Sequence, residues 1–296
     1  MPYLELLQHN PVLYLSFVFI LGLLVGSFLN VVIYRLPVML KQQWRSECLA
    51  FLGPPDTPEP TENPATAHPF NLVIPRSCCP ICGHQITALE NIPVLSYLFL
   101  RGRCRTCQTP ISFRYPSIEL LSAILVTLVA WKFGVTIQAA AAIFLTWCLI
   151  ALAFIDLDTQ YLPDNITLPF LWAGLIINLF NIFTDLQSAV IGAIAGYLVL
   201  WLIYQIFKQL TGKEGMGYGD FKLLALFGAW LGWQALPAII LLSSLVGSVV
   251  GISLILFKRH ARNRPIPFGP YLAIAGWIGL MWGAEINSAY LAWITN

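Results

Sequence analysis

The run VLYLSFVFILGLLVGSFLNVVIY, residues 12–34, decides the fold, because its 23 residues include no charged side chain. A transmembrane α-helix needs about 17–25 predominantly apolar residues. The whole chain of 296 residues has the same character: 58% are hydrophobic, 10% are charged and the mean hydropathy is +0.74. Soluble domains carry about 25% charged residues. The composition therefore predicts an integral membrane protein and excludes collagen-like, coiled-coil and disordered chains.

Seven further apolar runs follow a polar segment, residues 35–114. They cover residues 118–131, 137–155, 166–183, 189–207, 221–236, 238–257 and 270–294, and the second and sixth of all the runs are short. The predicted fold class is an all-α polytopic membrane protein with about eight transmembrane helices. We expect a first transmembrane helix at 1–34, a cytosolic segment at 35–115 and a membrane domain of about seven helices at 116–296. We find no internal repeat.

The basic residues predict the orientation. With eight spans, 15 of the 16 Lys and Arg fall on one side of the membrane, and Lys132 alone falls on the other. Cytoplasmic loops carry the excess of Lys and Arg, so both termini are expected to be extracytoplasmic. The N-terminus is not expected to be a cleaved signal peptide, because it lacks a basic start and its first apolar run is of full spanning length.

One part of the polar segment differs from the rest. Residues 53–69 contain six prolines, three acidic residues and no Lys or Arg. Such a stretch buries too little apolar surface to offset its ordering entropy. We expect a flexible insertion.

Four of the seven cysteines form two C-x-x-C pairs, Cys79/Cys82 and Cys104/Cys107, with 21 residues between them. Four thiolates in this pattern suit a tetrahedral, structural Zn²⁺ site in a reducing compartment, which predicts a zinc-ribbon-like insertion between the first and second spans. A pair of redox dithiols is the alternative. Three arginines are expected to favour the thiolates: Arg101, Arg103 and Arg105.

The other candidates near this cluster are interpreted as bystanders. Cys78 stands at the wrong spacing from Cys82, and His84 is interpreted as a loop residue rather than a ligand. Cys48 stands alone and Cys148 lies in an apolar run, so both are expected to be inert.

Acidic residues gather at the ends of two predicted spans. The segment DLDTQYLPD, residues 156–164, follows the third run, and GYGD, residues 217–220, precedes the sixth. Ionisable residues at membrane depth mark functional sites by default, although this inference is weaker at span ends. Two adjacent carboxyl groups cannot both ionise, so one acts as an acid while the other activates water. Glycines before Asp220 would allow the backbone a close approach.

The pattern alone leaves the choice among Asp156, Asp158 and Asp164 open. Asp164 could cap the following helix, Asp158 could be solvated, and the glycines could form a plain turn. The glycine segment is not a dinucleotide-binding loop, because no strand precedes it. The sequence contains no G-x-S-x-G or H-E-x-x-H motif.

Several motifs in order resemble the bifunctional type IV prepilin peptidases, also called prepilin leader peptidase/N-methyltransferases, over nearly the whole chain. They are GSFLNVVIYRLP (26–37), CPICGH (79–84), ENIPVLSY (90–97), the second cysteine pair, RYPSIE (114–119), the 156–164 segment, GYGD (217–220) and PFGPYL (267–272). The proline-rich insertion is not expected of this family.

The resemblance implies an aspartic endopeptidase that removes the short basic leader of prepilins and pseudopilins at the cytoplasmic membrane face. It implies that Asp156 and Asp220 are the catalytic pair, with Gly217, Gly219 and Asp164 in supporting roles. It also implies N-methylation of the new N-terminal residue, usually Phe, with S-adenosylmethionine as donor. The zinc segment marks the form of the family that methylates. No Rossmann-type motif is present, so the methyl-donor site is unassigned.

The implied location is the bacterial inner membrane, with the lipid bilayer and the prepilins as partners. No nucleic-acid partner is expected, and the sequence does not define the oligomeric state. One alternative is a non-enzymatic, zinc-stabilised assembly factor of a pilus or secretion system. Another is a transporter with an aspartate ion site, which would place acidic residues deeper in the spans.

Overall fold

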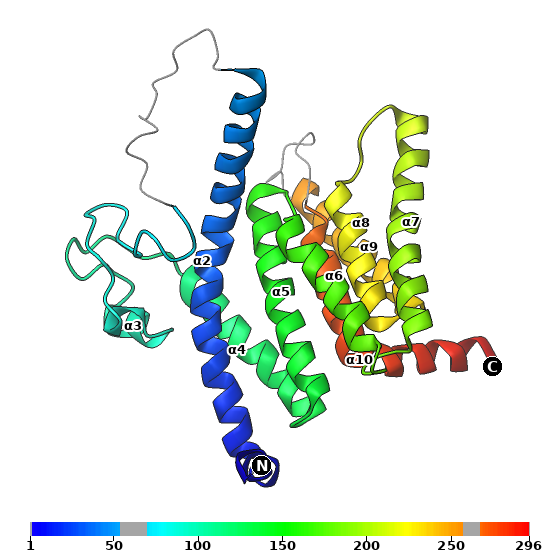
Figure 1. Cartoon of the computed structure of the whole chain (residues 1–296), viewed down its shortest axis with the longest axis horizontal. Helices are drawn as coiled ribbons and strands as arrows, with labels where there is room; N and C mark the ends of the chain where they lie inside the picture. The colour runs from blue at the N-terminus through cyan, green and yellow to red at the C-terminus, as the bar shows by residue number, and fades with distance from the viewer. Residues whose placement is uncertain (1, 54–69, 257–266, 296) are drawn as a thin grey trace. The chain divides into compact units, whose positions relative to one another are not determined.

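Helices form nearly all of the regular structure in the computed structural model, which describes residues 2–53, 70–256 and 267–295. Within these ranges there are no strands, and two isolated β-bridges lie in the cysteine segment. The elements in chain order (Figure 1) are α1 (Pro2–His9), α2 (Pro11–Leu52), η2 (Leu89–Asn91), α3 (Leu95–Phe99), α4 (Arg114–Phe133), α5 (Ile137–Thr159), α6 (Asp164–Asn178), α7 (Leu186–Thr211), α8 (Tyr218–Leu231), η3 (Trp233–Ala235), α9 (Leu236–Leu256) and α10 (Gly269–Thr295).

Each predicted apolar run falls mainly on one helix, so the all-α fold class is confirmed. In the described part of the chain, five segments are long and apolar enough to cross a membrane: Pro11–Leu52, Arg114–Phe133, Ile137–Thr159, Leu186–Thr211 and Trp233–Ser253. α6 and α8 are shorter, with 15 and 14 residues, and α10 is interrupted by non-helical dihedral angles at Trp282. The number of spans stays a prediction.

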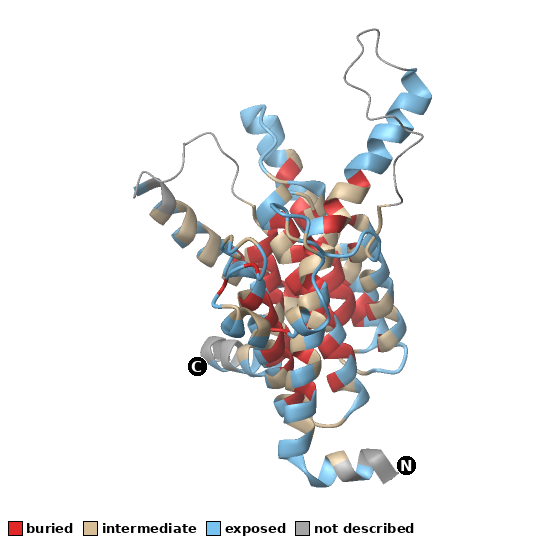
Figure 2. Cartoon of the chain, turned by 90° about the vertical axis from the view of Figure 1, so that its left-hand side faces the viewer, coloured by how far each residue is buried: buried red, intermediate tan, exposed pale blue. Residues whose placement is uncertain are grey.

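α2 differs from its prediction because it does not end at Tyr34. It continues through Pro37 to Leu52, for 42 residues in all. Its last turns, beside the grey trace, are exposed (Figure 2). The bilayer sets the length of an apolar run, whereas a helix continues wherever its backbone hydrogen bonds do. Of the predicted proline-rich insertion, residues 53–69, all but Gly53 lie outside the described residues.

The described residues between 16 and 127 form one compact unit. α2 and α4 approach closely in it: a Cβ atom on Gly22 would lie 2.6 Å from the Cα atom of Ala123. The hydroxyl of Ser122 also donates to the Gly22 carbonyl, at 2.8 Å. Small residues of this kind let membrane helices pack with their backbones in contact.

Arg35, which the sequence placed in the polar segment, belongs to α2 and is buried. Its guanidinium donates to the carbonyl oxygens of Asn71, at 2.9 Å, and Pro75, at 2.6 Å. These bonds attach the start of the cysteine segment to α2.

The described residues of the ranges 1–15 and 128–296 form the second unit. α5 and α8 are its most buried helices, and α8 packs against α6 and α7. The C-terminal end of α5 and the N-terminal ends of α6 and α8 lie at the same end of this unit (Figure 1). At the other end, the buried Asn178 amide donates to the carbonyls of Ala229 and Trp230, which fixes the end of α6 against the end of α8.

Candidate active site and metal centre

Two acidic motifs that are about sixty residues apart in the sequence meet in one cavity of the second unit. The cavity has a volume of about 230 Å³, and both Asp156 and Asp220 line it. The other lining residues are Gln160, Tyr161, Leu162, Asp164, Gly217, Tyr218, Gly219 and Lys222. The structure therefore brings together the two carboxyl groups that the family resemblance pairs.

Asp156 lies in the last turn of α5, and the helix is capped by Gln160, whose φ of 54° turns the chain toward α6. The Asp156 side chain is buried, and its Oδ2 accepts a hydrogen bond of 3.0 Å from the backbone N–H of Gly269. A backbone donor cannot rotate away as a side chain can. This bond therefore fixes the orientation of the carboxyl group.

Asp220 is the third residue of α8, and the helix begins after Gly217. The backbone N–H of Asp220 donates to the Gly217 carbonyl at 3.2 Å. The side chain of Asp220 is buried, and its carboxyl group interacts electrostatically with that of Asp156. A buried pair of interacting carboxyl groups is the arrangement in which one keeps its proton.

Leu162 lies between the glycines of two motifs. A Cβ atom on Gly219 would lie 2.8 Å from the Leu162 Cβ, and one on Gly269 would lie 3.3 Å from the Leu162 Cδ1 and 2.6 Å from the Asp156 Oδ2. Leu162 itself is buried. Because neither Gly219 nor Gly269 carries a Cβ atom, Leu162 can pack directly against the backbone at both residues. Gly217 has another role, because it is the N-cap residue of α8.

One interpretation of the sequence was that Asp164 caps the following helix, and the structure contradicts it. Pro163 is the N-cap residue of α6, and it makes no side-chain capping bond. The Asp164 carboxylate instead accepts from the ammonium of Lys222, with 2.7 Å from Nζ to each oxygen. Asp158 is exposed and is not among the cavity-lining residues.

In the other unit, the two cysteine pairs form two turns with the same backbone hydrogen bonds. The N–H of Cys79 donates to the carbonyl of His84 at 2.9 Å, and the N–H of Cys104 donates to that of Thr109 at 2.9 Å. The residue after the second cysteine of each pair has a positive φ, 71° at Gly83 and 58° at Gln108. The sequence showed no repeat, but the two turns are structural duplicates.

The four sulfur atoms lie within 4.8 Å of one another and could hold a metal ion. The Sγ atoms of Cys79 and Cys107 are 3.7 Å apart, and those of Cys82 and Cys104 are 3.9 Å apart. A tetrahedral ion with Zn–S bonds of about 2.3 Å places its sulfurs about 3.8 Å apart. The cysteines therefore fit Zn²⁺ in both number and spacing.

Hydrogen bonds around the sulfurs set the pKa values of the thiols. The Thr109 hydroxyl and backbone N–H lower the pKa of Cys107 to about 6, and the backbone N–H groups of Cys82 and Ile81 lower that of Cys79. At Cys82 the N–H of His84 favours the thiolate, but desolvation and the neighbouring sulfurs outweigh it and raise the pKa to about 12. A cation held among the sulfurs would supply the charge that lets all four ionise together.

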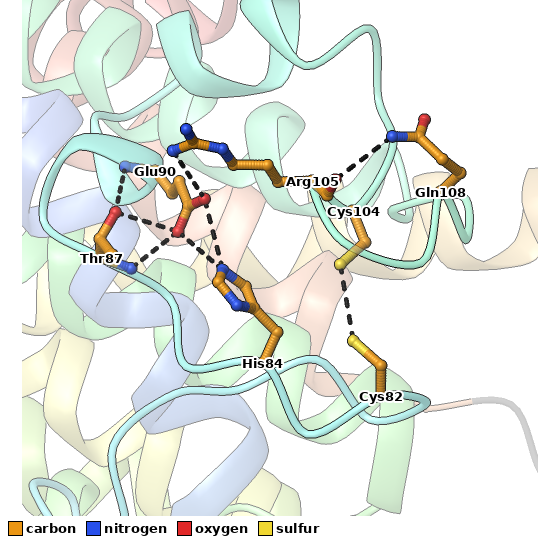
Figure 3. A network of polar contacts seen from close by, with 7 residues as sticks. All are labelled: Cys82, His84, Thr87, Glu90, Cys104, Arg105 and Gln108. Carbon is orange, nitrogen blue, oxygen red and sulfur yellow. Dashed lines mark hydrogen bonds and ion pairs between the residues drawn. The ribbon is translucent and has the colours of Figure 1, made fainter.

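A carboxylate connects the two turns (Figure 3). Glu90 accepts from the Thr87 N–H at 2.9 Å, contacts the His84 ring at 3.2 Å and pairs with Arg105 at 3.6 Å. The Thr87 N–H and hydroxyl, with a further contribution from His84, lower the pKa of Glu90 to about 2. His84 is thus held by Glu90, and Arg105 faces this carboxylate rather than standing free for the thiolates.

The remaining cysteines lie outside the cluster. Cys48 and Cys78 are exposed, and Cys148 is buried in α5.

Sequence reasoning gave no role to several residues of the cavity region, among them Gly269, Leu162 and Lys222. Gly269 and Leu162 stand inside motifs that the resemblance quoted, so they were visible but had no role. Lys222 was counted only as a basic residue that orients the chain. Its position two residues after Asp220 was the available signal.

Comparisons with known proteins agree with this architecture. Residues 20–133 match the bacterial peptidase A24 N-terminal domain, and residues 143–252 match the type IV leader peptidase family. The chain is 60% identical over 288 residues to a prepilin leader peptidase/N-methyltransferase of Aeromonas hydrophila, with 97% of each chain covered. It is 53% identical to the protein of that name from Stutzerimonas stutzeri (97% of each) and 51% identical to that from Neisseria gonorrhoeae (94% of this chain, 93% of the other). No solved structure matches the chain.

Proposed function

Because the chain belongs to the type IV leader peptidase family, we propose that it is a membrane aspartic endopeptidase that cleaves the leader peptide of type IV prepilins and pseudopilins and then N-methylates the new N-terminal residue. One observation carries the peptidase part of the proposal. Two buried, interacting carboxyl groups from different helices line one cavity.

The proposed hydrolysis needs only groups that this cavity holds. One carboxylate of the Asp156/Asp220 pair takes a proton from water, which attacks the scissile carbonyl carbon, while the protonated partner donates to the carbonyl oxygen. Proton transfer to the leaving amine nitrogen then completes the cleavage. The Gly269 N–H holds the Asp156 carboxyl group through Oδ2 during these steps.

The metal proposed for the four cysteines is Zn²⁺, in a structural role. Four thiolates complete a tetrahedral shell and leave no open position for water. The metal would hold the two turns together. For the second activity, S-adenosylmethionine is the proposed methyl donor and the new α-amine the acceptor.

The protein is proposed to act in the bacterial inner membrane, where it is a multi-pass protein. The proposed orientation keeps the termini outside the cytoplasm and the cysteine segment in the cytosol, as the distribution of Lys and Arg indicates. Cleavage would then occur at the cytoplasmic face. The non-enzymatic assembly factor is not favoured, because the relatives at 51–60% identity carry the name of an enzyme with both activities.

The test is cleavage of a purified prepilin by the detergent-solubilised protein, followed by mass spectrometry of the product. We expect loss of the leader, followed by a gain of one methyl group when S-adenosylmethionine is present. An intact prepilin after incubation with folded wild-type protein would contradict the proposal.

A further inference from the structure

The ion pair between Lys222 and Asp164 joins the two acidic motifs at the cavity. Lys222 is the one basic residue among the described residues that line it. Its Nζ lies 2.7 Å from both carboxylate oxygens of Asp164, and the two side chains are 27% and 42% exposed. Both partners lie near helix starts: Asp164 is the first residue of α6, and Lys222 is the fifth residue of α8, directly after its first turn.

The position of Lys222 on α8 links this pair to Asp220. Successive residues of an α-helix are rotated by about 100° around its axis. Side chains two positions apart therefore point toward nearly opposite sides of the helix. A contact that holds Lys222 therefore sets the rotation of the first turn that carries Asp220. This turn begins at Gly217 without a side-chain cap.

The position of Asp164 links the same pair to Asp156. The chain leaves α5 at Gln160, passes the buried Leu162 and enters α6 at Asp164. Leu162 meets Gly219, the residue before Asp220. The ion pair thus closes a ring of contacts that contains Asp220, and the end of α5, which carries Asp156, leads directly into this ring at Leu162.

Resting on the proposed function, we propose that Lys222 and Asp164 are a positioning pair, which holds the first turns of α6 and α8 so that Asp156 and Asp220 face the same substrate bond. Neither residue takes part in the bond-breaking step. Partly exposed ion pairs add little to stability, so the effect of this pair lies in geometry. A misplacement of about 1 Å at a reacting group can reduce a rate by about 100-fold.

The test measures kcat and KM separately for cleavage of a prepilin, together with the melting temperature of the full-length protein in detergent. For Lys222→Met and for Asp164→Asn we expect kcat to fall about 10-fold to 100-fold, and KM to stay within about threefold. Lys222→Arg should recover most of kcat because it keeps the charge. The exchanged double variant Asp164→Lys/Lys222→Asp should exceed either of its single variants.

Lys132→Met is the matched control. The Lys132 side chain is 25% exposed, which is similar to the exposed fraction of Lys222. Its Nζ lies 2.8 Å from the Glu285 carboxylate. It does not line the cavity. We expect this variant to keep the wild-type kcat.

Wild-type kcat in Lys222→Met would overturn the proposal, and so would a higher KM at unchanged kcat, which would make Lys222 a substrate-binding residue. If Lys222→Met does not fold, the Arg and exchanged variants decide, and failure of both to retain kcat overturns the positioning role. Asp156→Asn in the same assay separates the two ideas. Cleavage by Asp156→Asn would refute the aspartic mechanism. If Asp156→Asn is inactive but Lys222→Met has the wild-type kcat, only the positioning role of Lys222 and Asp164 is refuted.

Discussion

Replacing Gly269 by alanine should displace the carboxyl group of Asp156. The Gly269 N–H donates to Oδ2 at 3.0 Å, and a Cβ atom at this residue would lie 2.6 Å from Oδ2 and 3.1 Å from Cγ. Asp156 is only 5% exposed, so its carboxyl group has little free space into which it can turn. The added methyl group must therefore move the carboxyl group, the start of α10, or both.

The size of the effect follows from the cost of overpacking. One extra methyl group in a packed site costs about 1–3 kcal/mol. If that strain is expressed in the position of the carboxyl group in the transition state, each 1.36 kcal/mol reduces the rate tenfold, and kcat falls about 5-fold to 150-fold. KM should change less, because the substrate still binds to the same surface.

Two other glycines of α10 supply the controls. A Cβ atom on Gly283 meets nothing within 4 Å, so Gly283→Ala should leave both kcat and the melting temperature unchanged. A Cβ atom on Gly276 would meet the ring of Phe227, so Gly276→Ala should lower the melting temperature while the folded fraction keeps its kcat. Cleavage assays and thermal unfolding on the three variants separate a local effect from a general loss of packing. Wild-type kcat for a folded Gly269→Ala would refute the assignment of Asp156 as a precisely held catalytic group.

Three further predictions concern the two sites. Asp156→Asn and Asp220→Asn should each abolish cleavage while the protein still inserts into membranes, whereas Asp158→Asn should do less; complete leader removal by either of the first two variants excludes the aspartic mechanism. Replacing Cys79 and Cys104 by Ser should remove bound zinc, measured by metal analysis, and reduce methylation at least as much as cleavage, because structural zinc contributes about 10–16 kcal/mol in small peptides. Fully methylated pilin from this double variant, with one equivalent of zinc retained, would disprove the metal site. A chelator should not act directly on hydrolysis, because a carboxylate activates the water; immediate loss of cleavage that zinc alone restores would show the opposite.

The helices were predictable from the sequence because an apolar run is a local property. The eight runs fall on α2 and on α4 to α10. The continuation of α2 to Leu52 was not predictable in this way. Residues 35–52 carry charges that rule out a span, but charge does not end a helix, and even Pro37 is accommodated within it.

The proposed catalytic pair rests partly on the sequence. The motifs named a few acidic residues, and the resemblance selected Asp156 and Asp220 from them. The contacts that hold the pair were not predictable, because they are non-local. Gly269 is 113 residues from Asp156, and Lys222 is 58 residues from Asp164. No periodicity or spacing links such residues, so only the packing of the helices reveals them.

The four-cysteine cluster shows why a structural repeat can be invisible in a sequence. Each turn requires two cysteines and, after the second, a residue that adopts positive φ. Gly83 meets this requirement without strain, whereas Gln108 adopts a φ of 58° despite its side chain. The remaining contacts, such as the N–H of Cys104 to the Thr109 carbonyl, involve backbone atoms that any residue supplies. The two turns share only their cysteines in sequence. Their similarity is visible in the backbone hydrogen bonds and not in the identity of the other residues.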